Sequence, residues 1–155
     1  LRSECVACLL GGHGIPAEVG LAAYETLNRR GIVDKSFVTY DEVLQVLREP
    51  IALPNGRVVR YRFAAQKSRC LAELLNAELE PPTADRRDIR DWLTSFRGIG
   101  MKTASWIVRN WYSADDVAIL DIHIYRAGEL ASLLDAVIWH QMKKAGSLVH
   151  RLLSC

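Results

Sequence analysis

Lys102 and Asp121 are the two residues whose side chains and spacing point most directly to chemistry. Lys102 follows the tripeptide Gly98-Ile99-Gly100, so we expect it in the first turn of the next helix, where the helix dipole is positive. A positive helix end favours the neutral amine of a lysine, the form that attacks an electrophilic carbon. Asp121 follows a short apolar run and fits the N-cap of a later helix. Taken singly, a solvated lysine and a capping aspartate are ordinary, so their meaning depends on the elements that hold them.

A helix, a tight turn and a second helix must hold the lysine in place. The turn contains two glycines, Gly98 and Gly100, which let the backbone bend sharply and come close to another molecule. Before the turn, an apolar stripe at helical spacing predicts one helix, and residues 101–111 predict the next. The first amides of that second helix have no acceptor within it and lie at its positive end, which attracts phosphate. The predicted helix-hairpin-helix unit covers residues 89–111, and its predicted phosphate-binding residues are Arg97, Gly98, Ile99, Gly100 and Lys102.

The rest of the chain predicts an all-α fold. Apolar periodicity, glycines and prolines indicate helices at 4–10, from Pro16 to the break at Gly31, at 40–49, at 64–77, at 85–96, at 121–130 and at 134–144. Residues 52–57 indicate a turn, and 58–63 fit either a short strand or the entry to a helix. Two consecutive prolines mark a loop at 78–85, where we expect the chain to cross between lobes.

In combination, the segments G-I-G-M-K and A-I-L-D-I-H-I-Y-R resemble the helix-hairpin-helix DNA glycosylases, which have a glycine-rich hairpin and an aspartate. The resemblance implies that Lys102 and Asp121 are the catalytic pair, and His123 and Arg126 match the context of the family's aspartate. Members that only hydrolyse the base lack the lysine, so Lys102 implies the bifunctional branch, which also cleaves the strand as an AP lyase. Residues 17–24, 61–67 and 134–143 are similar to the small archaeal-type 8-oxoguanine DNA glycosylases.

This resemblance implies one domain, residues 1–155, with two helical lobes around a cleft. Its implied substrate is duplex DNA that contains a damaged base, an oxidised purine such as 8-oxoguanine. The base would be flipped out of the helix and removed through a Schiff base on the lysine, followed by β-elimination. This chemistry requires no metal and no cofactor. We expect a monomer with no membrane partner.

The base pocket is predicted mainly from the C-terminal part of the chain. The ring of Trp139 could stack on a flipped purine, with Met142 near it in the sequence, although Trp139 also fits a core position. Tyr61, Phe63 and Gln66 are further candidates for pocket or wedge residues, and each also fits a structural role.

Composition is ordinary for a soluble globular protein of 155 residues, with 50% hydrophobic and 25% charged residues. The net charge of +2 does not by itself demand a nucleic-acid partner. Basic residues around the hairpin favour a DNA-facing surface, but interleaved aspartates also fit a solvated face of mixed charge. These basic residues are Arg86, Arg87, Arg90, Arg97, Lys102 and Arg109.

Neither a membrane span nor a metal site is predicted. No apolar run approaches about 18 residues and no signal peptide is recognisable, so we expect an intracellular protein of the cytoplasm or nucleoid, or of a nucleus. The cysteines are Cys5, Cys8, Cys70 and Cys155, and only the first two are closely spaced, which makes a poor metal site.

Two alternative functions remain open at this stage. The same fold could act on another modified or alkylated base, because the lysine determines the chemistry at the sugar and leaves the choice of base open. The unit could also be a non-catalytic helix-hairpin-helix module that only binds DNA. Asp121 argues against this second alternative, because a binding module has no need of a lysine and an aspartate at this spacing.

Overall fold

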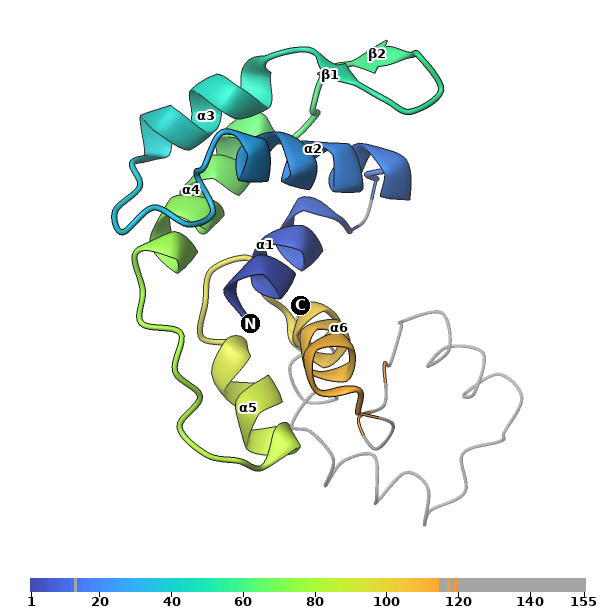
Figure 1. Ribbon diagram of the computed structural model, residues 1–155. Coiled ribbons are helices and arrows are strands. Elements are labelled where there is room, and N and C mark those ends of the chain that lie inside the picture. Colours follow the sequence, from blue (N-terminus) through green and yellow to red (C-terminus); the bar gives the residue numbers. More distant parts are fainter. Residues whose placement is uncertain (13, 115–116, 118, 120–155) are drawn as a thin grey trace, which may run out of the picture.

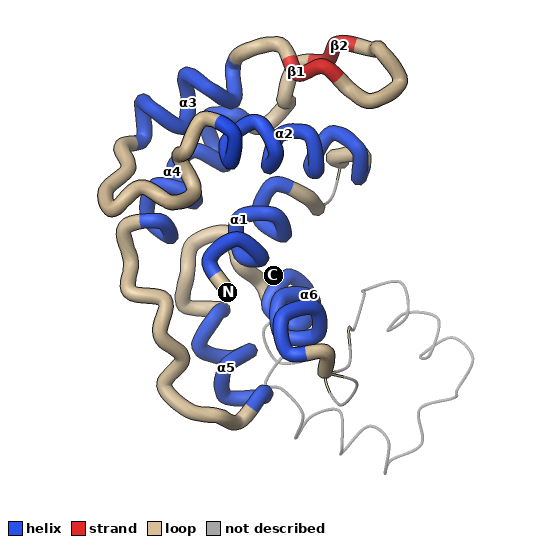
Figure 2. Tube along the Cα trace, in the orientation of Figure 1, coloured by secondary structure: helices blue, strands red, loops and turns tan. Residues whose placement is uncertain are grey.

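The computed structural model describes residues 1–12, 14–114, 117 and 119. The described part of the chain forms six helices and one small two-stranded sheet, so the all-α prediction is confirmed (Figure 1, Figure 2). The elements are α1 (Arg2–Leu10), α2 (Ala17–Arg29), α3 (Tyr40–Arg48), β1 (Ile51–Ala52), β2 (Val58–Val59), α4 (Ala64–Leu75), α5 (Arg86–Leu93) and α6 (Met101–Tyr112).

Helix α1 holds the described elements together. It packs against α2 and α4 and also against α6, so the helix-hairpin-helix unit and the preceding helices share one hydrophobic core. Its buried side chains are Cys5, Val6, Leu9 and Leu10. Helix α3 packs on α4, and α5 packs on α6. The site described below therefore rests on a core built from residues far apart in the sequence.

Local capping signals set the start of two helices. Thr39 and Glu42 form a reciprocal capping box at the start of α3, in which each side chain accepts a hydrogen bond from the backbone of the other residue. Asp85 caps α5, because its carboxylate accepts from the backbone N–H groups of Arg87 at 2.8 Å and Asp88 at 3.2 Å. Both caps lie in the sequence next to the helix that they start.

Helix α5 ends earlier than its apolar stripe predicts. The helix stops at Leu93, and the chain turns before it reaches Phe96. The ring of Phe96 nevertheless packs edge-on against Trp92, with ring centroids 5.1 Å apart. The apolar stripe therefore continues past the end of the helix, because its last residue, Phe96, packs from the turn.

Residues 51–59 form a short antiparallel hairpin, in which Ile51 pairs with Val59 and Ala52 with Val58. This settles the open choice for residues 58–63, because the segment begins as a strand and ends at Phe63, the N-cap of α4. The loop of residues 76–85 then connects α4 to the α5–α6 pair. None of the described helices has the length and apolar content that a membrane span requires.

Candidate functional site

The turn between α5 and α6 is held by its own backbone and by a buried side chain. Gly98 adopts a φ of +84°, which L-residues with a side chain rarely adopt. The N–H of Ile99 donates to the carbonyl of Phe96 at 3.1 Å, and the Ile99 side chain is only 4% exposed. Ile99 therefore anchors the turn, and its amide is already paired inside the protein. This pairing does not favour its predicted role in phosphate binding, and that role stays a prediction.

The two glycines of the turn have different surroundings. A Cβ atom on Gly98 would lie 2.8 Å from Sγ of Cys70 and 3.2 Å from Cδ2 of Leu9, so the absence of a side chain lets the turn pack against α4 and α1. A Cβ atom on Gly100 would meet no atom within 4 Å, and its φ of −88° suits any residue. Only Gly100 therefore leaves open space beside the turn for another molecule.

Helix α6 begins at this open position without a capping side chain. Gly100 is its N-cap, and no side chain caps it among the described residues. The N–H of Ala104 donates to the carbonyl of Gly100 at 2.8 Å, and the amides ahead of it have no acceptor inside the helix. Such an end combines N–H donors with the positive end of the helix dipole, which is the arrangement that binds phosphate.

Lys102 lies in the first turn of α6, as predicted, and it is exposed. Ala104 and Ser105, further along the helix, are buried and fix its opposite face on the core. Lys102 therefore lies on the exposed side of α6, two residues after Gly100. Five other predicted site residues lie outside the described residues: Asp121, His123, Arg126, Trp139 and Met142.

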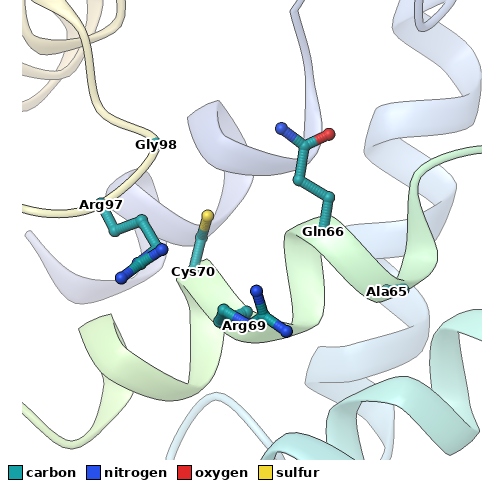
Figure 3. A pocket seen from close by; sticks show the side chains of 6 residues that line it. All are labelled: Ala65, Gln66, Arg69, Cys70, Arg97 and Gly98. Atoms are coloured by element: carbon teal, nitrogen blue, oxygen red, sulfur yellow. The ribbon is translucent and has the colours of Figure 1, made fainter.

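A pocket of about 330 Å³ lies between α4 and the turn. Figure 3 shows its lining: Ala65, Gln66, Arg69 and Cys70 from α4, and Arg97 and Gly98 from the turn. Nε of Arg97 pairs with a carboxylate oxygen of Glu73 at 2.8 Å, and both side chains are exposed. The pocket therefore has two guanidinium groups from two different elements.

The thiol of Cys70 is not activated for nucleophilic attack in this pocket. Its sulfur points toward the loop that carries Gly98 (Figure 3). Burial raises the pKa of the Cys70 thiol, and the charges of Lys67 and Arg97 offset this only in part. Since the thiolate is the nucleophilic form, Cys70 serves packing and not attack.

The three predicted pocket residues near the start of α4 have different environments. Gln66 lines the pocket. Phe63 is partly buried, and the guanidinium of Arg62 lies 5.1 Å from the centre of its ring. Tyr61 is 4% exposed and its hydroxyl donates to the carbonyl of Leu10 at 2.6 Å. Tyr61 is thus buried in the core, which favours the structural role that the sequence also allowed.

The basic residues predicted around the hairpin do not form one exposed surface. Arg90 is 6% exposed, and its guanidinium pairs with Asp91 at 2.8 Å. The charge of Arg97 is shared with Glu73. At Arg90 the interleaved Asp91 takes up the basic charge, as the alternative interpretation expects, whereas Arg97 pairs with a residue of α4.

Three lining residues were not predicted from the sequence: Ala65, Arg69 and Cys70. The signal was present, because positions 66, 69 and 70 fall on one face of a helix. What could not be seen was that this face meets the turn of the helix-hairpin-helix unit.

Comparison with known proteins gives one finding. The family model described as 8-oxoguanine DNA glycosylase matches residues 1–148 of the chain. Neither a curated protein nor a solved structure matches this chain.

Proposed function

Since the chain belongs to the 8-oxoguanine DNA glycosylase family, we propose that it removes 8-oxoguanine from duplex DNA through a Schiff base on Lys102 and then cleaves the strand. Family membership implies a DNA glycosylase that acts on DNA. The lyase step and the roles of individual residues are our proposal. The observation that carries it is an exposed lysine in the first turn of α6, next to the open N-cap at Gly100.

The turn binds the DNA backbone in this proposal. A phosphate approaches over Gly100, where no side chain intervenes, and accepts hydrogen bonds from amides at the start of α6. Arg97 lies in the preceding part of the turn, where a phosphate would compete with Glu73 for its guanidinium. These contacts position the DNA without reading its sequence, so they support binding to damaged and undamaged duplexes alike.

Lys102 supplies the nucleophile. Its neutral amine attacks C1′ of the flipped nucleotide, the bond between C1′ and the base breaks, and the base leaves with a proton. Opening of the sugar ring converts the C1′ adduct to a protonated Schiff base. Loss of a proton from C2′ then expels the 3′ phosphate, which cuts the strand. In this scheme the chain itself supplies the nucleophile, and no metal or cofactor takes part.

Asp121 stabilises the positive charge that develops on the sugar, or accepts the proton of the attacking amine. The assignment rests on the sequence, because Asp121 lies outside the described residues. Asp121→Asn keeps a residue that can cap a helix and removes the negative charge. We expect the excision rate to fall by about 10² to 10³, with normal DNA affinity. An excision rate near that of the native protein would leave Asp121 as a helix cap only.

The base pocket is proposed from Gln66, which lines the pocket beside the turn, with Phe63 near it and with Trp139 and Met142 from the C-terminal segment. If the Trp139 ring stacks on the flipped base, Trp139→Ala loses about 1 to 3 kcal/mol of lesion binding. Loss of a core tryptophan would lower stability instead, by about 3 to 5 kcal/mol. Thermal melting and lesion affinity measured on the same variant distinguish these roles.

Borohydride trapping on a duplex with a single 8-oxoguanine tests the whole proposal. Only an enzyme that forms a Schiff base becomes covalently linked to the DNA when the imine is reduced. We expect trapping with the native protein and none with Lys102→Gln or Lys102→Arg. The arginine variant keeps the positive charge, but a guanidinium stays protonated and cannot attack, so it separates chemistry from DNA binding. Arg48→Gln, an exposed substitution at the end of α3, is the control that should trap normally.

Other outcomes identify the alternatives. Excision without trapping would show a glycosylase that uses water in place of the lysine. Trapping on a duplex with another modified base, but not on 8-oxoguanine, would keep the chemistry and change the substrate. Binding without excision on every lesion tested would indicate a helix-hairpin-helix module that only binds DNA.

A further inference from the structure

The segment of residues 50–72 contains basic residues and no acidic ones. The whole chain has 20 Lys and Arg against 18 Asp and Glu, and this segment contains five of the basic residues and none of the acidic ones. The other residues together therefore carry 15 basic against 18 acidic side chains, a net charge of −3. The net positive charge of this protein thus comes from one continuous stretch, which includes β1, β2 and residues 64–72 of α4.

Four of the five basic residues face solvent. We call them the arginine strip, defined as Arg57, Arg60, Arg62 and Arg69. None of the four pairs with a carboxylate in the part of the chain that the structure describes. The fifth, Lys67, differs because its Nζ donates to the carbonyl of Gly11 at 3.4 Å, and burial lowers the pKa of its amine. Lys67 therefore contacts the protein's own backbone, and we do not count it in the strip.

The arginine strip is joined to the helix-hairpin-helix unit. Arg69 lines the same pocket as Arg97 and Gly98 of the turn (Figure 3). From there the strip follows α4 back to its start, where the guanidinium of Arg62 lies over the ring of Phe63 at 5.1 Å. Arg57 and Arg60 flank β2, one residue before it and one residue after it. The strip thus leads from the turn to the β hairpin.

Guanidinium groups without acidic partners are well suited to phosphate oxygens, which they bind with two parallel hydrogen bonds. We propose that the arginine strip binds the phosphate backbone of the duplex that flanks the lesion, so that the DNA extends from the turn past Arg69 to the β hairpin. The inference rests on the proposed function only in taking duplex DNA as the ligand. It adds a second backbone contact, from elements outside the helix-hairpin-helix unit.

Salt dependence of binding to an undamaged duplex tests the strip. Each phosphate that the protein neutralises contributes about 0.9 to the slope of log affinity against log salt concentration. Arg57→Gln with Arg60→Gln should therefore lower the slope by up to about 1.8 and weaken binding most at low salt. Arg57→Lys with Arg60→Lys should retain most of the slope, since the charge is kept.

A matched control separates direct contact from net charge. Arg29→Gln with Arg48→Gln removes the same two charges from exposed positions at the ends of α2 and α3, outside the strip. We expect its slope to equal that of the native protein. If both double variants lose the same amount of slope, the effect depends only on net charge and the proposal is overturned. A native slope in the strip variant would also overturn it, and would leave the strip facing another polyanion such as RNA or an acidic protein.

This experiment is independent of excision, because the duplex carries no lesion. If borohydride trapping fails while the strip variant loses its slope, the proposed chemistry is wrong and the DNA-binding strip stands. If trapping succeeds and the strip variant keeps the native slope, the chemistry stands and the strip is wrong.

Discussion

The Sγ atom of Cys70 lies so close to Gly98 that a Cβ atom at position 98 would be only 2.8 Å from it. Cys70 belongs to α4, and Gly98 is the residue of positive φ in the turn between α5 and α6. This contact sets how deeply the turn sits against α4. It therefore also sets where Gly100 and Lys102 are presented, and it closes one side of the pocket that contains Arg69 and Arg97.

Gly98→Ala should destabilise the protein by about 1 to 3 kcal/mol, because the new methyl group meets Cys70 and Leu9 and the φ of +84° disfavours a side chain. Urea unfolding measures this loss. Gly100→Ala is the matched control, and it should change stability by less than about 0.5 kcal/mol, since its φ is ordinary and its Cβ meets open space. Equal stability of the two variants would contradict the role assigned to the Gly98 contact.

Gly100→Val should keep the native fold and weaken binding to every duplex, damaged or not. The turn can accept this residue, so the effect comes from the isopropyl group that occupies the path of the phosphate. Fluorescence anisotropy with a matched pair of duplexes, with and without one lesion, measures both affinities. A loss confined to the damaged duplex would instead place Gly100 in the base pocket.

Tyr61→Phe should cost about 1 to 2 kcal/mol of stability, because the carbonyl of Leu10 loses its buried hydrogen-bond donor. Lesion preference, measured as the ratio of affinities for damaged and undamaged DNA, should not change. Gln66→Ala offers the complementary test: Gln66 is exposed at the pocket, so stability should stay within about 0.5 kcal/mol of native while lesion preference falls. If instead Tyr61→Phe lowers lesion preference and Gln66→Ala lowers stability, Tyr61 is the pocket residue and Gln66 the structural one.

Alkaline pH should destabilise the protein through Cys5. Burial raises the pKa of this thiol from 9.0 to about 12. Above pH 9 the unfolded state loses the thiol proton while the folded state keeps it, so stability declines as the pH rises from about 9 toward about 12. In Cys5→Ala this decline should be shallower by up to about 1.4 kcal/mol per pH unit. Parallel curves of unfolding free energy against pH for native and variant protein would contradict this.

Local residues determined most of the helix-hairpin-helix unit. Asp85 starts α5, glycines make the turn, and Lys102 falls in the first turn of α6, each because of residues within a few positions along the chain. Such signals depend on backbone conformation and on hydrogen bonds between near neighbours. For the same reason, the periodic pattern predicted the all-α fold.

Tertiary packing decided what each of these residues does. Gly98 and Gly100 are alike in the sequence, but only Gly98 meets Cys70, a residue 28 positions away. Tyr61 is a core residue, and its hydroxyl donates a hydrogen bond to the carbonyl of Leu10, 51 positions away. Arg97 shares its charge with Glu73, whereas Arg69 faces the same pocket without a carboxylate partner among the described residues. Burial, clash and charge pairing depend on which distant residues meet, and sequence periodicity reports only which face of a helix is turned inward.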